Sequence, residues 1–230
     1  MANPTHHNYE EYMTLWEEHG IETTKRSKRQ SRRKPKSRQA PSPKIKSLED
    51  IRTWLGECKR CGLCEGRNKI VFGNGNSNAK LMFIGEGPGA EEDKTGFPFV
   101  GRAGTLLTKI IEAMGFTRED VYIANIVKCR PPGNRVPDPE EIESCVPFLK
   151  AQIEIIQPKM IVALGLTAAS TLTGNDSTMG LLRGRFHPLA WDSKRALMAT
   201  YHPAYLLRNP AAKKIVWEDM KLVVKQLKGH

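Results

Sequence analysis

The chain has 230 residues, of which 39% are hydrophobic, and its formal net charge at pH 7 is +11. This length suits one globular domain with an extension. No apolar run is long enough to span a bilayer, and the first residues lack a basic-then-apolar leader. We therefore expect a cytoplasmic protein without a membrane partner. In that compartment thiols stay reduced, so its five cysteines are better explained as ligands than as disulfides.

The charge is distributed unevenly along the chain. Residues 1–24 contain five acidic residues and no Lys or Arg, whereas residues 25–46 contain eleven Lys or Arg and no acid. Such a basic segment with few apolar residues cannot offset its ordering entropy. We therefore predict that residues 1–46 form a disordered extension and residues 47–230 the folded domain. Within the extension, an apolar set at helical spacing favours one short amphipathic helix: Tyr9, Tyr12, Met13 and Trp16. A basic chain favours a polyanionic partner, most simply a nucleic acid, and the extension would tether DNA or a protein partner.

From residue 47 onward the pattern alternates between helices and strands. We predict strands at 79–86, 121–127, 159–165 and 195–200. We predict helices at 47–58, 104–114, 138–157 and 166–172, and a last helix that starts at Asn209-Pro210. The helix at 138–157 is marked by Asp138 as N-cap, Pro139 and two glutamates in its first turn. Alternating strands and helices indicate an α/β fold with three α/β/α layers around a central, mostly parallel four-stranded sheet.

Three of the predicted strands end in loops rich in chemically active residues. These loops are residues 85–104, which are rich in glycine, residues 125–135 and residues 202–208. Ligands of open parallel sheets bind at the carboxyl edge of the strands. We therefore expect the three loops to form one site at that edge.

The cysteines allow three interpretations. Cys58 and Cys61 form a C-x2-C pair, Cys64 extends it, and Cys129 and Cys145 follow far downstream. Zinc usually takes two compact pairs, whereas a [4Fe–4S] cluster tolerates scattered thiolates. Some of the cysteines would otherwise be small core residues. Spacing alone leaves the choice of ligands among the first three cysteines open.

Three segments carry a resemblance to a known family: GEGPGAEEDKTGFPFVGRAG (85–104), NIVKCRPPGNR (125–135) and HPAYLLR (202–208). With the cysteines at these places, residues 48–228 strongly resemble the iron–sulfur, family 4 uracil-DNA glycosylases. That resemblance implies a [4Fe–4S] cluster on Cys58, Cys61, Cys129 and Cys145, with no ligand role for Cys64. It also implies removal of uracil from DNA as the first step of base excision repair, by a monomer associated with the nucleoid.

The residue types fit this chemistry. An enzyme that acts on a base takes it out of the stack and holds it in a pocket. Phe99 would stack on the flipped ring, and Asn125 would bind the uracil edge at N3 and O4 because an amide both donates and accepts. His202 would donate to O2 as negative charge grows on the departing base; a buried structural histidine is the simpler explanation when this residue is taken alone.

The flanking residues complete the predicted site. By resemblance, Glu86 and Gly87 occupy the first catalytic motif; other branches have an Asp where this chain has Gly87, so the residue that positions water stays open. Glu92 would crowd a 5-methyl group and exclude thymine. We include Asp93 in the substrate site, although these acids also suit a solvated face. Leu206 and Leu207 would enter the gap that the base leaves, and Arg208 would contact a phosphate.

Two further expectations concern the reaction class. A related branch crosslinks to DNA through a His in the segment after the Asn motif; residues 129–145 contain no His, so we expect ordinary turnover by a monofunctional glycosylase. The alternative function is a non-catalytic iron–sulfur module that binds nucleic acid or senses redox state. A zinc-stapled RNA-processing factor is a third interpretation.

Overall fold

The computed structural model describes residues 45–229, so the predicted basic extension and its short helix lie almost entirely outside the described residues. The α-helices are α2 (Leu48–Leu55), α3 (Ala90–Thr95), α4 (Arg102–Ala113), α5 (Pro139–Ile156), α6 (Leu166–Thr173), α7 (Met179–Leu182), α8 (Pro203–Arg208) and α9 (Ala212–Lys228). Two short 3-10 helices are η1 (Gly62–Cys64) and η2 (Pro132–Asn134). The strands are β1 (Asn74–Gly75), β2 (Leu81–Gly85), β3 (Tyr122–Asn125), β4 (Met160–Leu164), β5 (Phe186–Leu189) and β6 (Asp192–Thr200).

In this part of the chain the strands form a six-stranded sheet in the order β1-β3-β2-β4-β6-β5. The four predicted strands are its centre, and β3, β2, β4 and β6 pair in parallel. The prediction of only four strands was incomplete, because β1 and β5 add antiparallel edges. Both edge strands are largely exposed and therefore lack the apolar run that marked the central strands.

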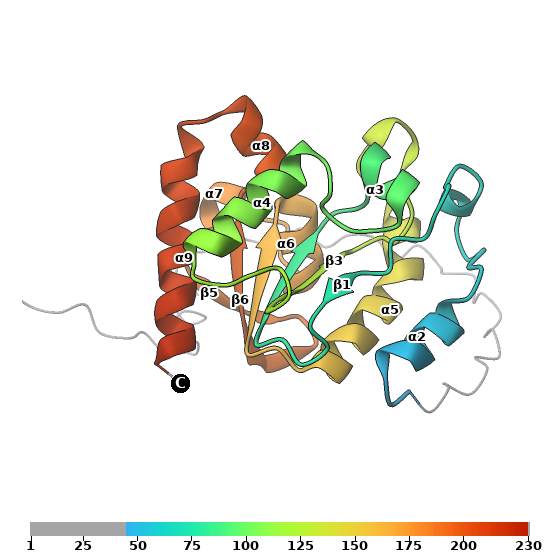
Figure 1. Ribbon diagram of the computed structural model, residues 1–230, viewed down its shortest axis with the longest axis horizontal. Coiled ribbons are helices and arrows are strands. Elements are labelled where there is room, and N and C mark those ends of the chain that lie inside the picture. The colour runs from blue at the N-terminus through green and yellow to red at the C-terminus, as the bar shows by residue number, and fades with distance from the viewer. Residues whose placement is uncertain (1–44, 230) are drawn as a thin grey trace, which may run out of the picture. The chain divides into compact units, whose positions relative to one another are not determined.

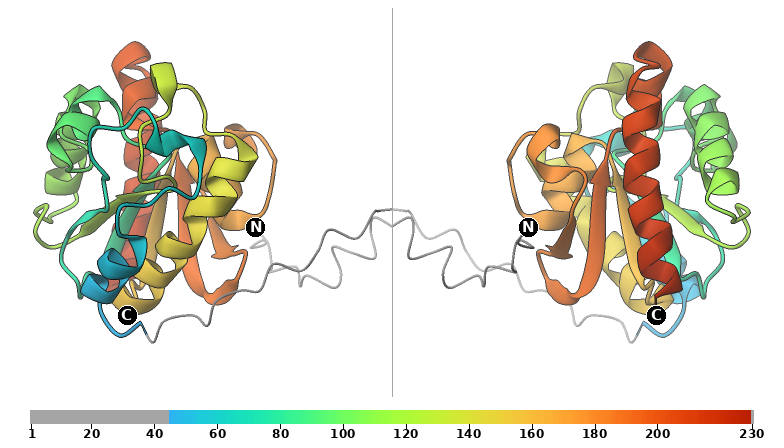
Figure 2. Two further views of the ribbon diagram at one scale, coloured as in Figure 1. Left: turned by 90° about the vertical axis from the view of Figure 1, so that its right-hand side faces the viewer. Right: turned by 90° about the vertical axis from the view of Figure 1, so that its left-hand side faces the viewer.

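Helices cover both faces of the sheet, which confirms the three-layer α/β/α architecture (Figures 1 and 2). Alternation along β2 directs Met82 and Ile84 to one core and Leu81 and Phe83 to the other. The first core is covered by α2, α5, α6 and α7. The second is covered by α4, α8 and α9. All of these strand residues are almost fully buried, as expected for a parallel sheet covered on both faces.

Side chains cap the starts of α2 and α5. Ser47 Oγ accepts a hydrogen bond from the Asp50 N–H (3.1 Å) at the start of α2. In α5, the Glu141 side chain returns to the Asp138 N–H (2.8 Å). The last helix starts at Ala212, later than predicted, because Asn209 instead ends α8.

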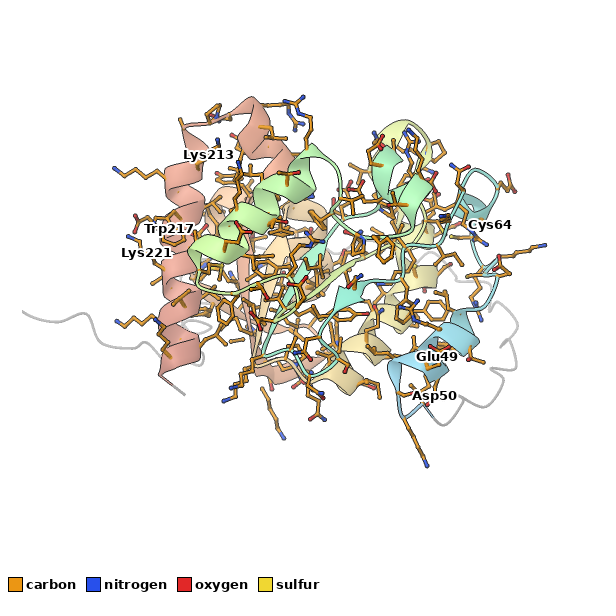
Figure 3. All side chains as sticks on the ribbon, viewed as in Figure 1. Glu49, Asp50, Cys64, Lys213, Trp217 and Lys221 are labelled. Atoms are coloured by element: carbon orange, nitrogen blue, oxygen red, sulfur yellow. The ribbon has the colours of Figure 1, made fainter. Side chains whose placement is uncertain are left out.

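All three predicted loops contain short helices, and η2 lies within residues 125–135. Helix α3 lies within residues 85–104, and residues 203–208 form α8, with His202 as N-cap and Pro203 in the first turn. The turn with the first three cysteines lies at the opposite end of the domain from α9. Figure 3 shows Cys64 at one end and Lys213, Trp217 and Lys221 of α9 at the other.

Candidate active site and cysteine centre

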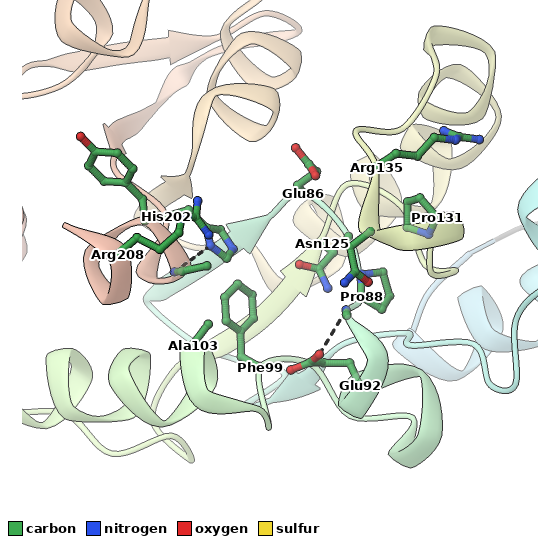
Figure 4. Close-up of a pocket in the computed structure, with 15 residues that line it drawn as sticks. Glu86, Pro88, Glu92, Phe99, Ala103, Asn125, Pro131, Arg135, His202 and Arg208 are labelled. Atoms are coloured by element: carbon green, nitrogen blue, oxygen red, sulfur yellow. Dashed lines mark hydrogen bonds between the residues drawn. The ribbon is translucent and has the colours of Figure 1, made fainter.

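A pocket of about 430 Å³ lies at the carboxyl edge of the sheet, where the three predicted loops meet (Figure 4). Residues 85 and 125 end neighbouring strands and are direct partners in the parallel ladder. Most of the predicted site residues line this one pocket: Glu86, Gly87, Glu92, Phe99, Asn125, His202 and Arg208.

Asn125 lies at the base of this pocket with only 1% of its surface exposed. Its Oδ1 is buried and has no hydrogen-bond partner among the described residues. The adjacent Gly85 makes room for it, since a Cβ at that position would stand 2.6 Å from Asn125 Oδ1 and 2.6 Å from Phe99 Cζ. A buried acceptor without a partner is costly. The site therefore suits a ligand that brings an N–H to this oxygen.

Phe99 forms a buried wall of the pocket in a constrained conformation. Its φ is +53°, which is uncommon for a residue with a side chain. Gly104 allows the loop to pass closely, because a Cβ there would stand 1.9 Å from the Phe99 carbonyl oxygen. The Arg118 guanidinium donates to the carbonyl oxygens of Pro98 (2.9 Å) and Phe99 (3.2 Å). These contacts fix the aromatic wall before any base arrives.

Glu92 stabilises the same loop through backbone amides. One carboxylate oxygen accepts hydrogen bonds from the N–H groups of Val100 (2.9 Å) and Gly101 (3.0 Å). The other accepts from the Gly89 N–H (3.1 Å), a contact marked in Figure 4. Glu92 therefore lines the pocket and also anchors the loop that carries Phe99. Spacing in the sequence gave no sign of this second role.

His202 is held as a neutral ring. Its Nδ1 accepts a hydrogen bond from the Ala204 N–H (3.1 Å), so the proton of the neutral ring resides on Nε2. Burial, assisted by the positive charge of Arg208, lowers the pKa of His202 to about 4. The ring packs against Phe99 with centroids 5.5 Å apart. At neutral pH the site thus offers an uncharged N–H donor.

Glu86 and Gly87 leave β2 and enter the pocket. Thr167 Oγ1, at the start of α6, donates to a Glu86 carboxylate oxygen at 2.5 Å. A Cβ at position 87 would stand 2.8 Å from Val127 Cγ2. The pocket wall is therefore closely packed at Gly87.

The structure does not bring Asp93 or Leu206 to the pocket. Asp93 is buried on the far side of α3, where its carboxylate accepts from Asn68 and Lys69. Leu206 is 1% exposed and packs in the core beneath α8. Leu207 is 38% exposed and stays available for an intercalating role.

Several pocket residues were not predicted as site residues. Asn134 and Arg135 lie within NIVKCRPPGNR, and Tyr205 lies within HPAYLLR. Asn134 Oδ1 accepts from Arg130 Nε (2.8 Å), and Arg135 forms a bidentate pair with Glu141. The one sequence feature that could have indicated these pocket residues is the repeated presence of polar side chains in the two motifs.

All five cysteines line a second, small cavity beside α5, and none forms a disulfide. Three of the sulfurs accept hydrogen bonds: Cys58 from Arg60 (3.2 Å), Cys129 from Arg67 (3.5 Å) and Cys145 from the Lys128 backbone N–H (3.3 Å). Burial raises the pKa of Cys61, and the backbone N–H of Leu63 partly offsets that effect. No such donor to Cys64 is present within residues 45–229.

The described residues contain no group of three or more His, Cys, Asp or Glu side chains arranged to hold one metal ion. A tetrahedral zinc site with bonds of about 2.3 Å needs its sulfurs roughly 3.8 Å apart. A four-iron cluster is larger and takes its four thiolates from a wider shell.

Across the described part of the chain, no helix has both the length and the apolar character needed to cross a membrane.

Comparison with known proteins identifies the family of this chain. Residues 72–221 match the model of the uracil DNA glycosylase superfamily. The type-4 uracil-DNA glycosylase of Thermotoga maritima is 48% identical over 76% of this chain and 91% of its own. The type-4 enzyme of Sulfurisphaera tokodaii is 45% identical over 77% of this chain and 83% of its own. That of Archaeoglobus fulgidus is 40% identical over 78% and 92%, respectively. The chain therefore belongs to the uracil DNA glycosylase superfamily and, within it, to the type-4 uracil-DNA glycosylases.

Proposed function

We propose that this protein removes uracil from DNA by hydrolysing its N-glycosidic bond. The buried Asn125 amide carries the proposal. Uracil presents an N3–H between two carbonyl groups, and Asn125 can accept from N3–H through its unpartnered Oδ1 while its Nδ2 donates to O4. Cytosine lacks the N3–H and has an amino group in place of O4. Cytosine would leave the buried amide mismatched, which a polar site rejects strongly.

His202 would stabilise the leaving base. When the bond between C1′ and N1 breaks, its electron pair moves into the uracil ring and charge develops on O2. The Nε2–H of the neutral ring is the donor suited to that oxygen, since Nδ1 is occupied by Ala204. A preorganised donor in a site with little water is worth more than in solution. A water molecule then adds to C1′ and loses a proton, which leaves an abasic site.

The remaining pocket residues would hold an extruded nucleotide. Phe99 presents a buried aromatic face for stacking. Leu207, exposed on α8, is the residue suited to enter the gap in the duplex, and Arg208 lies beside it for a phosphate contact. A non-catalytic binding module would not require an enclosed amide beside a neutral histidine donor.

We propose that the cysteine cavity holds a [4Fe–4S] cluster through Cys58, Cys61, Cys129 and Cys145. These four sulfurs receive N–H donors from Arg60, Leu63, Arg67 and Lys128, whereas Cys64 receives none among the described residues. Hydrogen bonds to ligating sulfur are the expected support for such a cluster. When bound, the cluster would covalently join segments that are distant in the chain. It would have a structural role and would take no part in the reaction of the base.

The test is a uracil-release assay. A duplex with a single uracil is incubated with the protein and treated with alkali, which cleaves the strand at an abasic site. We expect cleavage at the uracil only, and no cleavage of a matched duplex that carries thymine or cytosine there. Protein with a full metal complement that leaves the uracil duplex intact would overturn the proposal.

A further inference from the structure

Arg67 joins two of the cysteine segments. Its side chain is only 9% exposed. Its Nη1 donates to the Cys58 carbonyl oxygen (2.5 Å) and to Cys129 Sγ (3.5 Å). The residues that follow Arg67 are therefore fixed relative to the cysteine centre.

These following residues are fastened to Asp93 on α3. The Asn68 N–H donates to Asp93 Oδ1 (2.9 Å), Asn68 Nδ2 donates to Oδ2 (2.5 Å), and the Lys69 N–H makes a longer contact with Oδ1 (3.4 Å). Asp93 is 1% exposed and does not line the uracil pocket. A buried carboxylate is costly without such donors. Its position therefore indicates a role in joining these two segments.

Helix α3 transmits this attachment to the pocket. The helix has six residues, too few to be stable through its own hydrogen bonds, so tertiary contacts must hold it in place. The residue before Asp93 is Glu92, whose carboxylate holds Val100 and Gly101 beside Phe99. A continuous chain of contacts thus runs from the cysteine centre through Asp93 to the aromatic wall of the pocket.

We propose that Asp93 is a positioning residue that couples the cysteine centre to the uracil pocket. This inference rests on the proposed function, because it assumes that the two sites hold a cluster and uracil. Coupling between two sites is reciprocal: if the centre orders the pocket, a ligand in the pocket must stabilise the centre. The consequence can be measured without turnover.

The experiment follows iron loss from the cluster-loaded full-length protein to a chelator, with and without saturating free uracil. In the unchanged protein, uracil should slow iron loss by about fivefold or more, the lower end of common coupling between sites. Asp93→Ala should abolish this slowing and lose iron faster without uracil. Hydrogen exchange at Val100 and Gly101 should also accelerate in this variant. Lys94→Gln is the matched control, since it alters only an exposed ion pair on the same helix.

Asp93→Asn keeps one acceptor oxygen and should show intermediate coupling, which keeps the test available if Asp93→Ala does not fold. Iron content and uracil release of the unchanged protein are measured first, and their absence would contradict the proposed function. If both are present, equal slowing by uracil in the unchanged protein and in the Asp93 variants would overturn this inference alone. No slowing in any of them would overturn it as well.

Discussion

Phe99 and His202 are neighbours in the pocket lining, with ring centroids 5.5 Å apart and ring planes inclined by 32°. Atoms in contact stand about 3.5–4.0 Å apart, so a base between two rings would need roughly 7 Å. Uracil therefore does not fit between these rings as they stand. We therefore expect uracil to lie against Phe99 with an edge toward His202, the orientation in which an imidazole N–H meets a carbonyl oxygen in the plane of the base.

The first prediction concerns the two polar groups of the pocket. His202→Ala and Asn125→Ala should each lower the single-turnover rate of uracil excision by about 100-fold or more, the usual loss for one preorganised donor. The measurement is quenched-flow excision with enzyme in excess over the uracil duplex. Circular dichroism and iron content serve as controls for folding. Full rates in both variants would place the active site elsewhere.

The second prediction concerns pH. With a folded-state pKa of about 4, His202 should remain neutral throughout the range from pH 8 to pH 5. The excision rate should therefore show no loss near pH 6.5 that depends on this residue. The unfolded histidine binds a proton at higher pH than the folded one, so the free energy of unfolding should decrease as pH falls from about 6.5 toward 4. Nitrogen chemical shifts of an imidazolium His202 at pH 6.5 would contradict this.

The third prediction concerns the cysteines. Iron and sulfide should assay at about four each per chain in protein made under anaerobic, iron-replete conditions. Cys64→Ala should keep this content, whereas Cys145→Ala should lose it. The two variants form a matched pair because both cysteines line the same cavity. Stoichiometric zinc without sulfide would be evidence for a different centre.

The fourth prediction concerns selectivity. Glu92→Ala should raise release of thymine relative to uracil, because it removes the side chain expected to crowd a 5-methyl group. It should also lower uracil release itself, because Val100 and Gly101 lose their acceptor. Competition between thymine and uracil duplexes measures the ratio. An unchanged ratio would restrict Glu92 to its role as a loop anchor.

The fifth prediction concerns the basic extension. A shortened protein that begins at Pro43 lacks nine of the eleven basic residues of segment 25–46. It should keep its cluster and single-turnover chemistry, since every pocket residue lies downstream. Its affinity for undamaged DNA should fall, and the dependence of that affinity on salt should become shallower. Equal affinity and equal slope would make a protein partner the better assignment for the extension.

The central fold was predictable because its signals are local. The four central strands are apolar runs, and α5 is marked by Asp138, Pro139 and Glu141 at its start. The edge strands escaped detection because β1 consists of two exposed residues and β5 is largely exposed. Helix α8 was overlooked although His202 and Pro203 are a capping pair, because six residues give too short a pattern to recognise.

The sequence predicted which loops form the pocket, but it did not predict the hydrogen bonds that join residues distant in the chain. Motif residues could be assigned to one edge of the sheet because parallel strands place their ends together. The contacts of Glu86 with Thr167 and of Asn68 with Asp93 join residues 81 and 25 positions apart, respectively. No spacing rule connects such pairs. Leu206 and Leu207 are adjacent and chemically equal, and only the orientation of α8 separates the buried one from the exposed one.

The strand order has a consequence for how the enzyme is made. Strand β2 pairs on one side with β3 and on the other with β4, and β6 pairs with the far side of β4. Asn125 and His202 thus meet only after three parallel pairings with long crossovers, a topology that folds slowly. A nascent or truncated chain that ends before β6 would hold Phe99 and Asn125 but no leaving-group donor. Such a chain would therefore lack the donor on which the proposed excision depends.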